Sequence, residues 1–498
     1  MKNKNRFLEV LALIVLGLVL YIALGNEWTH LDVDSEGYLH IATKEGVMPL
    51  FPLFLRLIKC LVGESIQTTV AVVLQGLLAV ISTLVFTLFI KDSFSLKTWE
   101  TILVYLLCAV PFYIYFPDYV VTHQILTEGL TYSLYYLFLW QIFKAVKTRR
   151  IRNILGVLIV SIVLGLTRTQ LMLCVPFAAL VIWRVVYVGF KKKGSGLIRF
   201  LLTGILAGVI AILGVILVQR TYTFYLDKIT VQLSEEKRVE VAYNGDARLL
   251  FKDIDRDSYE IVENANVVWN SLVFDYATGQ LGTVAMIKGF YEADEDDWQL
   301  FDTPEEQEVF KCIYADLEKY EYLYKYAKPG LYMWQDLVKD RIPLVVVEGM
   351  ADYCRAHPEV QMNVYISRQD MALTLLKAHW GRALYHFLRL EIMSLIASVF
   401  FQVERVYALC HVITLIIYAM FIFGIWYSVK KKADSFLAEC AVILLGFILI
   451  MTGGTNVLFI GFQRYVVYNI GVFYILLYLM VGKDILNRLI FRNASEIK

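Results

Sequence analysis

The amino-acid sequence predicts an all-α polytopic membrane protein with about ten transmembrane helices and an α-rich domain outside the cytoplasm. Three observations support this fold class. The 498 residues are 58% hydrophobic and 19% charged, whereas soluble proteins carry about 25% charged residues. The apolar residues gather in nearly uncharged blocks of roughly 18 to 25 residues, each long enough to cross a hydrocarbon core of about 30 Å. The acidic residues are concentrated in one segment between these blocks.

Seven apolar blocks precede the acidic segment and three follow it. The first seven lie at about 7–24, 66–90, 101–116, 124–146, 153–166, 170–189 and 199–218. The last three lie at about 406–428, 436–452 and 465–482. Basic residues precede the first block, as in a signal peptide, but no small-residue cleavage site follows it. We therefore predict that it is an uncleaved span.

The segment between the two groups of blocks is predicted to be a separate domain. Residues 221–380 contain 29 acidic and 16 basic residues, a net charge of −13, and the rest of the chain carries +14. We therefore divide the chain into three parts. Residues 1–218 form a seven-span module whose first outer loop is 25–65, residues 219–402 form the acidic domain with an interfacial helix, and residues 403–498 form a three-span module with a tail. This charge pattern gives no indication of a nucleic-acid partner.

Basic clusters predict the orientation, because loops rich in Lys and Arg stay in the cytoplasm. Ten spans place the clusters at 2–6, 144–152, 191–193 and 430–432 inside, with both termini cytoplasmic and the acidic domain outside. Residues 383–401 are apolar enough to form an eleventh span, but they contain His386, Arg389 and Glu391. A charge at the centre of a span costs about 2.5–3.5 kcal/mol. We therefore predict an amphipathic helix in the outer interface, with an eleventh span as the alternative.

The acidic domain is predicted to be rich in α-helix. Residues 303–328 have helical periodicity, with Thr303 as the N-cap and acidic residues in the first turn. Residues 343–380 form a second mostly helical stretch. Cys312 and Cys354 lie on the side of the membrane where a disulfide persists, so they either pair or remain free thiols.

Three carboxylates mark the first outer loop. Asp32, Asp34 and Glu36 fall within five residues, and Tyr38 begins a short amphipathic stretch after them. Carboxylates beside a membrane can accept a proton from a hydroxyl group or hold a divalent cation. A solvated acidic loop is the alternative interpretation.

Charged residues at the outer ends of later spans form a second group. Glu128 lies at the outer end of the fourth span, where the helix dipole favours an acid, and His123 precedes it. Arg168 and Arg464 lie in short outer links that carry no other charge, although basic residues usually avoid outer loops. Arginine binds phosphate through several donors. The alternatives are a helix-start acid for Glu128 and anchors to lipid headgroups for the arginines. The many Tyr and Phe residues of the spans are expected to face lipid or the interface.

These residues resemble the outer-face motifs of the GT-C superfamily of glycosyltransferases, which includes protein O-mannosyltransferases and lipid A aminoarabinose transferases. The pattern Asp-x-Asp-x-x-x-Tyr-x-x-x-Ala at 32–42 is similar to their first outer loop, and it is followed by Gly46, Pro49 and Pro52. Many members carry an adjacent Asp-Glu pair in that loop, whereas here Ser35 separates Asp34 from Glu36.

Three shorter motifs extend the resemblance. They are Thr127-Glu128 at the start of the fourth span, Thr167-Arg168 between the fifth and sixth spans, and Arg464-Tyr465 before a late span. Each motif is only two residues long, so their order and their placement on one membrane face make the case. The resemblance covers 1–218 well and 400–482 loosely, and it does not extend to 220–380.

The resemblance implies an inverting transfer of a sugar from a polyprenyl-phosphate donor to a glycan, lipid or protein acceptor outside the membrane. Asp34 would be the catalytic base, with Asp32 and Glu36 beside it. Arg168 and Arg464, with Tyr465, would bind the donor phosphate.

The resemblance also implies an acceptor cavity that contains Glu128, Tyr38 and His123. Asp34 and Glu128 are the candidate ligands if a divalent cation, Mg or Mn, takes part. An apolar cavity between spans would take the polyprenyl chain. The low Pro content and Lys-rich N-terminus favour a bacterial plasma membrane and a role in the cell envelope.

Two other functions remain open at this point. A transporter or flippase of a lipid-linked glycan would place charges near the middle of its spans, whereas the charges here lie at span ends. A non-catalytic assembly protein would use the acidic domain to bind a partner and would tolerate loss of Asp34, Arg168 or Arg464.

Overall fold

The computed structural model describes residues 2–25, 29, 31, 35, 38–39, 48–113, 121–190, 196–225, 290, 292–319, 353, 356–357, 365–400, 407–430, 435–458 and 467–483. Within these ranges the chain forms helices and no strand, so the predicted all-α class is confirmed there. The chain divides into two units, one of residues 1–233, 398–451 and 466–498 and the other of residues 234–397 and 452–465. The three-part division drawn from the sequence stays a prediction.

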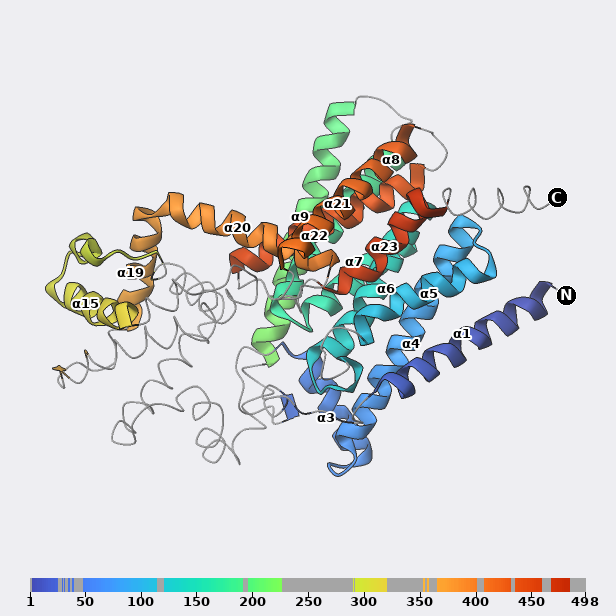
Figure 1. Ribbon diagram of the computed structural model, residues 1–498, viewed down its shortest axis with the longest axis horizontal. Helices are drawn as coiled ribbons and strands as arrows, with labels where there is room; N and C mark the ends of the chain where they lie inside the picture. The colour runs from blue at the N-terminus through green and yellow to red at the C-terminus, as the bar shows by residue number, and fades with distance from the viewer. Residues whose placement is uncertain are drawn as a thin grey trace. The chain divides into compact units, whose positions relative to one another are not determined.

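Most helices of the first unit come from the N-terminal half of the chain (Figure 1). They are α1 (Lys2–Leu24), α3 (Leu50–Val62), α4 (Gln67–Phe94), α5 (Thr98–Tyr113), η1 (Val121–His123), α6 (Thr127–Thr148), α7 (Ile151–Gly165), η2 (Thr169–Leu173), α8 (Cys174–Phe190) and α9 (Gly196–Phe224). The C-terminal half adds α21 (Tyr407–Lys430), most of α22 (Ser435–Leu458), η10 (Val467–Asn469), α23 (Ile470–Leu477) and the π-helical turn η11 (Tyr478–Gly482).

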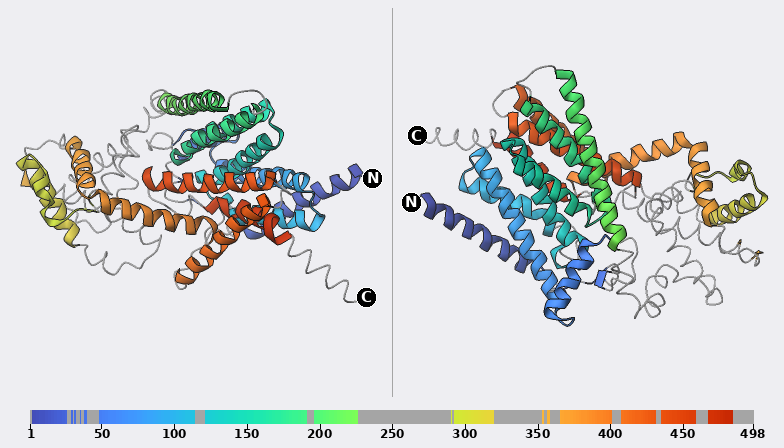
Figure 2. Two further views of the ribbon diagram at one scale, coloured as in Figure 1. Left: turned by 90° about the horizontal axis from the view of Figure 1, so that it is seen from above. Right: turned by 180° about the vertical axis from the view of Figure 1, so that it is seen from behind.

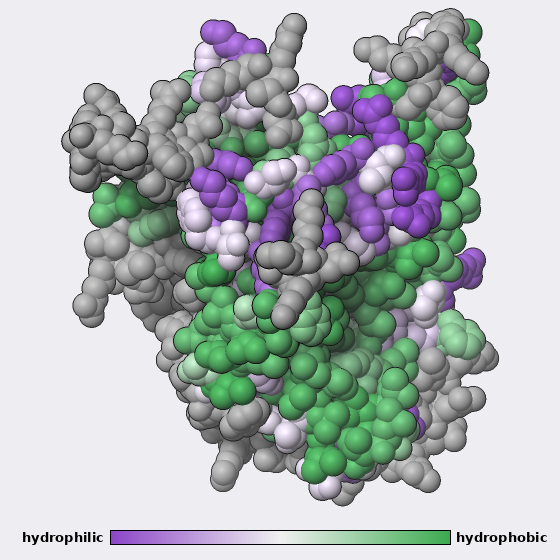
Figure 3. Space-filling model, turned by 90° about the vertical axis from the view of Figure 1, so that its right-hand side faces the viewer, coloured by the Kyte–Doolittle hydropathy of each residue, from purple (hydrophilic) through white to green (hydrophobic). Residues whose placement is uncertain are grey.

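Six helices of the described chain are long and apolar enough to cross a membrane, so the chain is a multi-pass membrane protein. They cover Arg6–Leu24, Gln67–Phe94, Thr169–Val188, Ile198–Phe224, Ala408–Lys430 and Ser435–Asn456. Three shorter apolar helices cover Thr98–Tyr113, Ile151–Gly165 and Val467–Gly482. Much of α1, α9 and α21 consists of exposed large apolar side chains, as expected of a surface in contact with lipid. Figure 3 shows broad hydrophobic areas beside a band of hydrophilic side chains on one face.

The helices of the first unit pack largely in sequence order. α4 packs on α6, α6 on α7, α7 on α8 and α8 on α9, while α23 packs on α5 (Figure 2). α6 and α7 form an antiparallel hairpin because only two residues separate them. Arg149, with φ of 53°, takes the left-handed conformation that ends α6.

Most residues of α6 are buried, and they include all its Tyr and Phe residues. Tyr132, Tyr135 and Tyr136 are each fully buried, and the ring of Tyr136 lies against Phe86 and Phe112. The expectation that aromatic residues of the spans face lipid is therefore wrong for α6. These tyrosines contact neighbouring helices instead, because α6 packs on α4, α7 and α8.

The short helix α3 lies between α1 and α4, in the second half of the segment predicted to be the first outer loop. It buries Phe51, Leu55 and Ile58 in an apolar cluster with Tyr21 of α1 and residues of α4. Tyr38 packs against this cluster, with its ring edge-on to Phe51 at a centroid distance of 5.2 Å. The backbone N–H of Leu50 donates to the carbonyl of Leu166 at 3.0 Å, which ties the start of α3 to the end of α7.

The second unit contains η5 (Glu295–Leu300), α15 (Pro304–Lys319), α19 (Tyr365–Ala378) and nearly all of α20 (Trp380–Val399). Thr303 caps α15 as predicted, because its hydroxyl accepts the backbone N–H of Glu306 at 3.2 Å and donates to the Glu306 carboxylate at 2.9 Å. The predicted end of this helix at Pro329 lies outside the described residues. Cys354 does too, so its pairing with Cys312 stays a prediction.

Helix α20 covers most of residues 383–401, for which the sequence predicts an interfacial helix or, alternatively, an eleventh span. It is not among the six helices of the described chain that could cross a membrane. Its Glu391 accepts hydrogen bonds from Thr452 Oγ1 at 2.5 Å and Asn456 Nδ2 at 2.8 Å, in the last turns of α22. Burial raises the pKa of the Glu391 carboxyl, and these two hydrogen bonds oppose the rise. Leu384, Leu388 and Ile392 of α20 are exposed at a spacing of four residues.

The contact between α23 and α5 depends on a glycine and gives a first prediction. A Cβ atom at Gly471 would lie 2.4 Å from the carbonyl oxygen of Leu107 and 2.5 Å from the hydroxyl of Tyr136. Gly471→Ala should therefore push α23 from α5 and destabilise the fold by about 1–3 kcal/mol. The measurement is the melting temperature of the purified protein in detergent.

The control variant is Gly446→Ala in α22, where nothing lies within 4 Å of the added Cβ atom. This change should leave the melting temperature unchanged or raise it, since alanine is favoured over glycine in a helix by about 1 kcal/mol. Equal melting temperatures for the two variants would contradict the close packing of α23 on α5.

Candidate functional site

The charged residues that precede α6 and follow α7 meet in the first unit. Glu128 lies in the first turn of α6, where the free backbone N–H groups favour a carboxylate. α7 ends at Gly165, the Thr167 hydroxyl donates to the carbonyl of Leu164 at 2.6 Å, and Arg168 continues in extended conformation. The guanidinium of Arg168 forms an ion pair with the Glu128 carboxylate.

This ion pair is buried. The side chain of Glu128 is 3% exposed and that of Arg168 is 12% exposed. Thr127 donates a hydrogen bond from Oγ1 to the second carboxylate oxygen of Glu128 at 3.1 Å. The sequence singled out both charged residues as separate groups, and the structure brings them together as one ion pair.

Buried amides hold the chain segment that leads into α6. The Gln75 side chain of α4 donates from Nε2 to the backbone carbonyls of Gln124, at 2.9 Å, and Thr122, at 3.4 Å. Gly129 lets Gln75 approach, since a Cβ atom there would lie 2.6 Å from the amide of Gln75. These contacts position Glu128 from the side of α4.

His123 occupies an apolar setting beside this segment. Its ring stacks on Tyr21 at a centroid distance of 4.5 Å, and its Nδ1 lies 3.2 Å from the Thr122 hydroxyl. Burial lowers the pKa of the His123 imidazole, so the neutral form is favoured near pH 7. A neutral imidazole can exchange hydrogen bonds with a sugar hydroxyl but does not serve as a fixed positive charge.

Polar atoms without partners accumulate around the same half of α6. Among the described residues, no hydrogen-bond partner exists for the side-chain polar atoms of Gln124, Thr131, Ser133 and Tyr468. All four side chains are buried. Buried polar groups in proteins almost always have partners, and exceptions are frequent at functional sites. Sequence analysis missed all four, since none belongs to a charged motif.

Several predicted site residues lie outside the described residues. They are Asp32, Asp34, Glu36, Arg464 and Tyr465. Of the other predicted residues, Tyr38 packs on the α3 cluster and His123 stacks on Tyr21, whereas Glu128 and Arg168 contact each other directly.

The carboxylate oxygens of Glu128 are not placed to bind a divalent cation. One oxygen of the carboxylate already faces the guanidinium of Arg168, and the other accepts from Thr127. A cation at Glu128 would lie next to a fixed positive charge. Asp34, the other predicted ligand, lies outside the described residues, and we assign no step to a metal.

A small pocket among the described residues lies between α1, α4 and α5. Its lining includes Gly17, Leu20, Val80 and Phe112, and its volume is about 10 Å³. This is room for about one water molecule. It is too small for a polyprenyl chain, and the predicted cavity for that chain stays a prediction.

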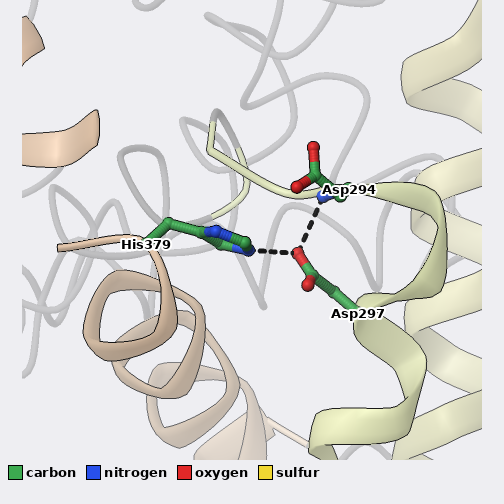
Figure 4. A group of neighbouring side chains, drawn as sticks. All are labelled: Asp294, Asp297 and His379. Atoms are coloured by element: carbon green, nitrogen blue, oxygen red, sulfur yellow. Dashed lines mark hydrogen bonds and ion pairs between the residues drawn. The ribbon is translucent and has the colours of Figure 1, made fainter. Parts of the chain in front are cut away.

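A second polar cluster joins η5 to the start of α20 in the second unit. His379, between α19 and α20, points its Nε2 at the Asp297 carboxylate at 2.6 Å, and Asp297 also accepts the backbone N–H of Asp294 at 2.7 Å (Figure 4). Arg382 donates to both oxygens of Asp294, at 2.7 and 3.0 Å. His386 contacts the Glu292 carboxylate at 2.5 Å. We call these six residues the η5 clasp.

The η5 clasp contains a possible metal triad, because ligand atoms of Asp294, Asp297 and His379 lie within 4.8 Å of one another. However, Arg382 contacts Nδ1 of His379, and a guanidinium can only donate. Nδ1 is therefore the acceptor and Nε2 carries the proton given to Asp297. A metal needs the lone pair of Nε2 and would displace Arg382, so the observed bonds favour a structural role.

Comparisons with known proteins do not identify the chain. A scan against protein-family models finds no match, and a search of curated proteins finds no significant relative.

The buried ion pair gives a prediction for stability. Glu128→Gln and Arg168→Gln should each destabilise the protein by about 3–5 kcal/mol, because each leaves the other charge buried. The double variant Glu128→Gln/Arg168→Gln should lose less than the sum of the two, with a coupling energy above about 1 kcal/mol. Chemical unfolding of the four proteins in detergent measures this coupling.

The control is the same cycle on Arg6 and Asp92, an ion pair whose side chains are 61% and 53% exposed. Its coupling should not exceed about 0.5 kcal/mol. Additive losses for Glu128→Gln and Arg168→Gln would show that the two charges do not stabilise each other.

The η5 clasp gives a prediction for pH dependence. The hydrogen bond from Arg382, aided by its charge, lowers the pKa of the Asp294 carboxyl below its ordinary 3.8. A lowered pKa in the folded state contributes stability above about pH 4, and this contribution disappears as the pH falls through the lowered pKa. Because both side chains are about half exposed, the gain should stay below about 1 kcal/mol.

Hydrogen exchange of residues 292–300 measures this contribution. Arg382→Gln should reduce protection at pH 6, and its difference from the wild type should be smaller at pH 3. Lys377→Gln, which removes an exposed positive charge from α19, should leave protection unchanged at both values. A loss of protection in Arg382→Gln that is as large at pH 3 as at pH 6 would contradict the assignment.

Proposed function

We propose that the protein is an inverting glycosyltransferase that moves a sugar from a polyprenyl-phosphate donor to an acceptor on the outer face of the membrane. The observation that carries the proposal is the buried Arg168–Glu128 ion pair at the joint where α6 begins and α7 ends. It lies beside a group of buried polar atoms without partners among the described residues.

A purely structural role explains this arrangement poorly. Removing two charges from water costs several kcal/mol for each ion, and a hydrophobic pair of similar size often stabilises a protein as well or better. Charged residues kept inside a membrane protein usually serve a substrate or ion. An arginine beside unpartnered hydroxyls suits an anionic group with several oxygens, such as a phosphate.

The proposed reaction assigns a role to each predicted residue. Asp34 takes the proton of the acceptor hydroxyl while the acceptor oxygen attacks C1 of the sugar. The bond between C1 and the phosphate oxygen breaks, and the electron pair leaves with the polyprenyl phosphate. Arg168 and Arg464 stabilise the charge that develops on this phosphate, where fixed donors contribute most.

Glu128 holds Arg168 in place while the phosphate binds. The guanidinium has five N–H donors, so it can keep its contact with Glu128 and still donate to a phosphate. Glu128 thereby supports the binding of the sugar donor through Arg168. This role is additional to the part in binding the sugar acceptor that its motif implies.

We propose a topology of ten spans with both termini in the cytoplasm, in a bacterial plasma membrane. The nine apolar helices of the described chain, together with α6, supply these spans. Helix α20 would lie in the outer interface, because its exposed Leu384, Leu388 and Ile392 form an apolar stripe that can enter the lipid surface.

Transfer by the purified protein in lipid tests the proposal. We expect a panel of radiolabelled polyprenyl-phosphate sugars and membrane acceptors to contain a pair that the wild type uses. Asp34→Asn should lower the rate by about 10²–10⁴-fold, the usual contribution of a general base. Asp92→Asn, which changes an exposed carboxylate near the C-terminal end of α4, should leave the rate unchanged.

Two outcomes would contradict the proposal or part of it. Full activity of Asp34→Asn would exclude Asp34 as the base and direct attention to Asp32 and Glu36. Movement of a lipid-linked sugar across the bilayer without any transfer would instead favour a flippase.

A further inference from the structure

Tyr468 of η10 stands out among the buried residues that contact α6. Its side chain is 1% exposed. Its ring is tilted on Tyr135 at a centroid distance of 4.6 Å and meets Tyr132 edge-on at 5.7 Å. Both contacts come from α6, one and two turns after Glu128. The ring of Tyr468 is therefore fixed from two sides.

The hydroxyl of Tyr468 has no hydrogen-bond partner among the residues that the structure describes. The adjacent Tyr135 shows the usual arrangement, since its hydroxyl donates to Oδ1 of Asn469. Burying a hydroxyl without a partner is unfavourable, and phenylalanine would fill the same space without this cost. The hydroxyl is thus unexplained by packing alone.

Tyr468 lies on the same face of α6 as Glu128 and its partner Arg168, because its ring contacts Tyr132, one helical turn after Glu128. The Thr131 hydroxyl, one turn along α6 from Glu128, is also buried and without a partner in the described part of the chain. A guanidinium and two hydroxyls can donate to different oxygens of one anionic group.

We propose that Tyr468 is a phosphate-binding residue whose hydroxyl donates, beside Arg168, to an oxygen of the polyprenyl-phosphate donor. This assignment rests on the proposed function and adds a residue outside the motifs that suggested it. The phosphate gains a negative charge when the bond to the sugar breaks, so a fixed donor of this kind stabilises the leaving group more than the bound substrate.

Tyr136 supplies a matched control. Its hydroxyl is likewise buried and lacks a partner among the described residues, but its ring lies against Phe86 and Phe112. Phe86 belongs to α4 and Phe112 to α5. Tyr136→Phe and Tyr468→Phe therefore remove the same atom from equally buried rings, and of the two only Tyr468 has a described ring contact with Tyr132, one turn after Glu128.

The experiment measures binding and stability of the full chain in lipid nanodiscs. The probe is citronellyl phosphate, a ten-carbon isoprenoid phosphate, compared with citronellol, inorganic phosphate and phosphatidic acid. We expect the wild type to prefer citronellyl phosphate. Tyr468→Phe should weaken this binding about tenfold, equivalent to about 1.4 kcal/mol, and should raise the melting temperature of the ligand-free protein. Tyr136→Phe should raise the melting temperature without changing the binding.

The possible failures are distinguishable. If Arg168→Gln weakens binding but Tyr468→Phe does not, the assignment of Tyr468 is wrong and the proposed function stands. If Tyr468→Phe lowers the melting temperature and weakens binding only as much as Tyr136→Phe, the role is structural and the assignment is wrong. Equal binding of phosphatidic acid would overturn the polyprenyl donor as the ligand, and equal binding of citronellol would overturn both the assignment and the proposed function.

Discussion

The arrangement of the first unit depends on burying two opposite charges, those of Glu128 and Arg168, inside a helix bundle. Glu128 and Arg168 can be withdrawn from water together only if they remain in contact, since either charge alone would be strongly unfavourable there. This requirement links the start of α6 to the end of α7. It also explains the supporting contacts, in which Gln75 holds the segment before α6 and Leu50 binds the carbonyl of Leu166. Each contact fixes one side of the joint at which the charges meet.

Helix lengths show why the joint has its particular form. α6 has 22 residues and α7 has 15, so at 1.5 Å per residue they are about 33 Å and 22 Å long. In an antiparallel hairpin this leaves a gap of about 10 Å at the end away from the turn. Leu166 and Thr167 form a turn at the end of α7, with the N–H of Thr167 donating to the carbonyl of Leu164 at 2.9 Å, and Arg168 then continues in extended conformation. The turn, the extended Arg168 and its long side chain together bring the guanidinium to Glu128.

Sequence analysis identified the charges at this joint but could not show how they pair. Glu128 and Arg168 were conspicuous because charges are rare near spans, whereas their contact depends on how α7 ends and the chain turns after it. Tyr468 gave no such signal, since tyrosines are common in this chain and their burial depends on which helices surround α6. The cap of α15 was predictable because Thr303 and Glu306 are close in sequence. The η5 clasp was not, because its partners are more than 80 residues apart.

The η5 clasp and the polar residues around the first half of α6 differ in whether their polar groups have hydrogen-bond or ion-pair partners. In the η5 clasp, every carboxylate meets an arginine or histidine, and Arg382 bridges two of its members. Such a closed network fixes one geometry and leaves little capacity for a ligand. Around the first half of α6, the ion pair lies among hydroxyls and amides with no partner in the described chain. Unmatched donors of this kind lower the stability of the empty protein and become favourable only when a polar ligand meets them. This property is expected of a binding site and not of a structural core.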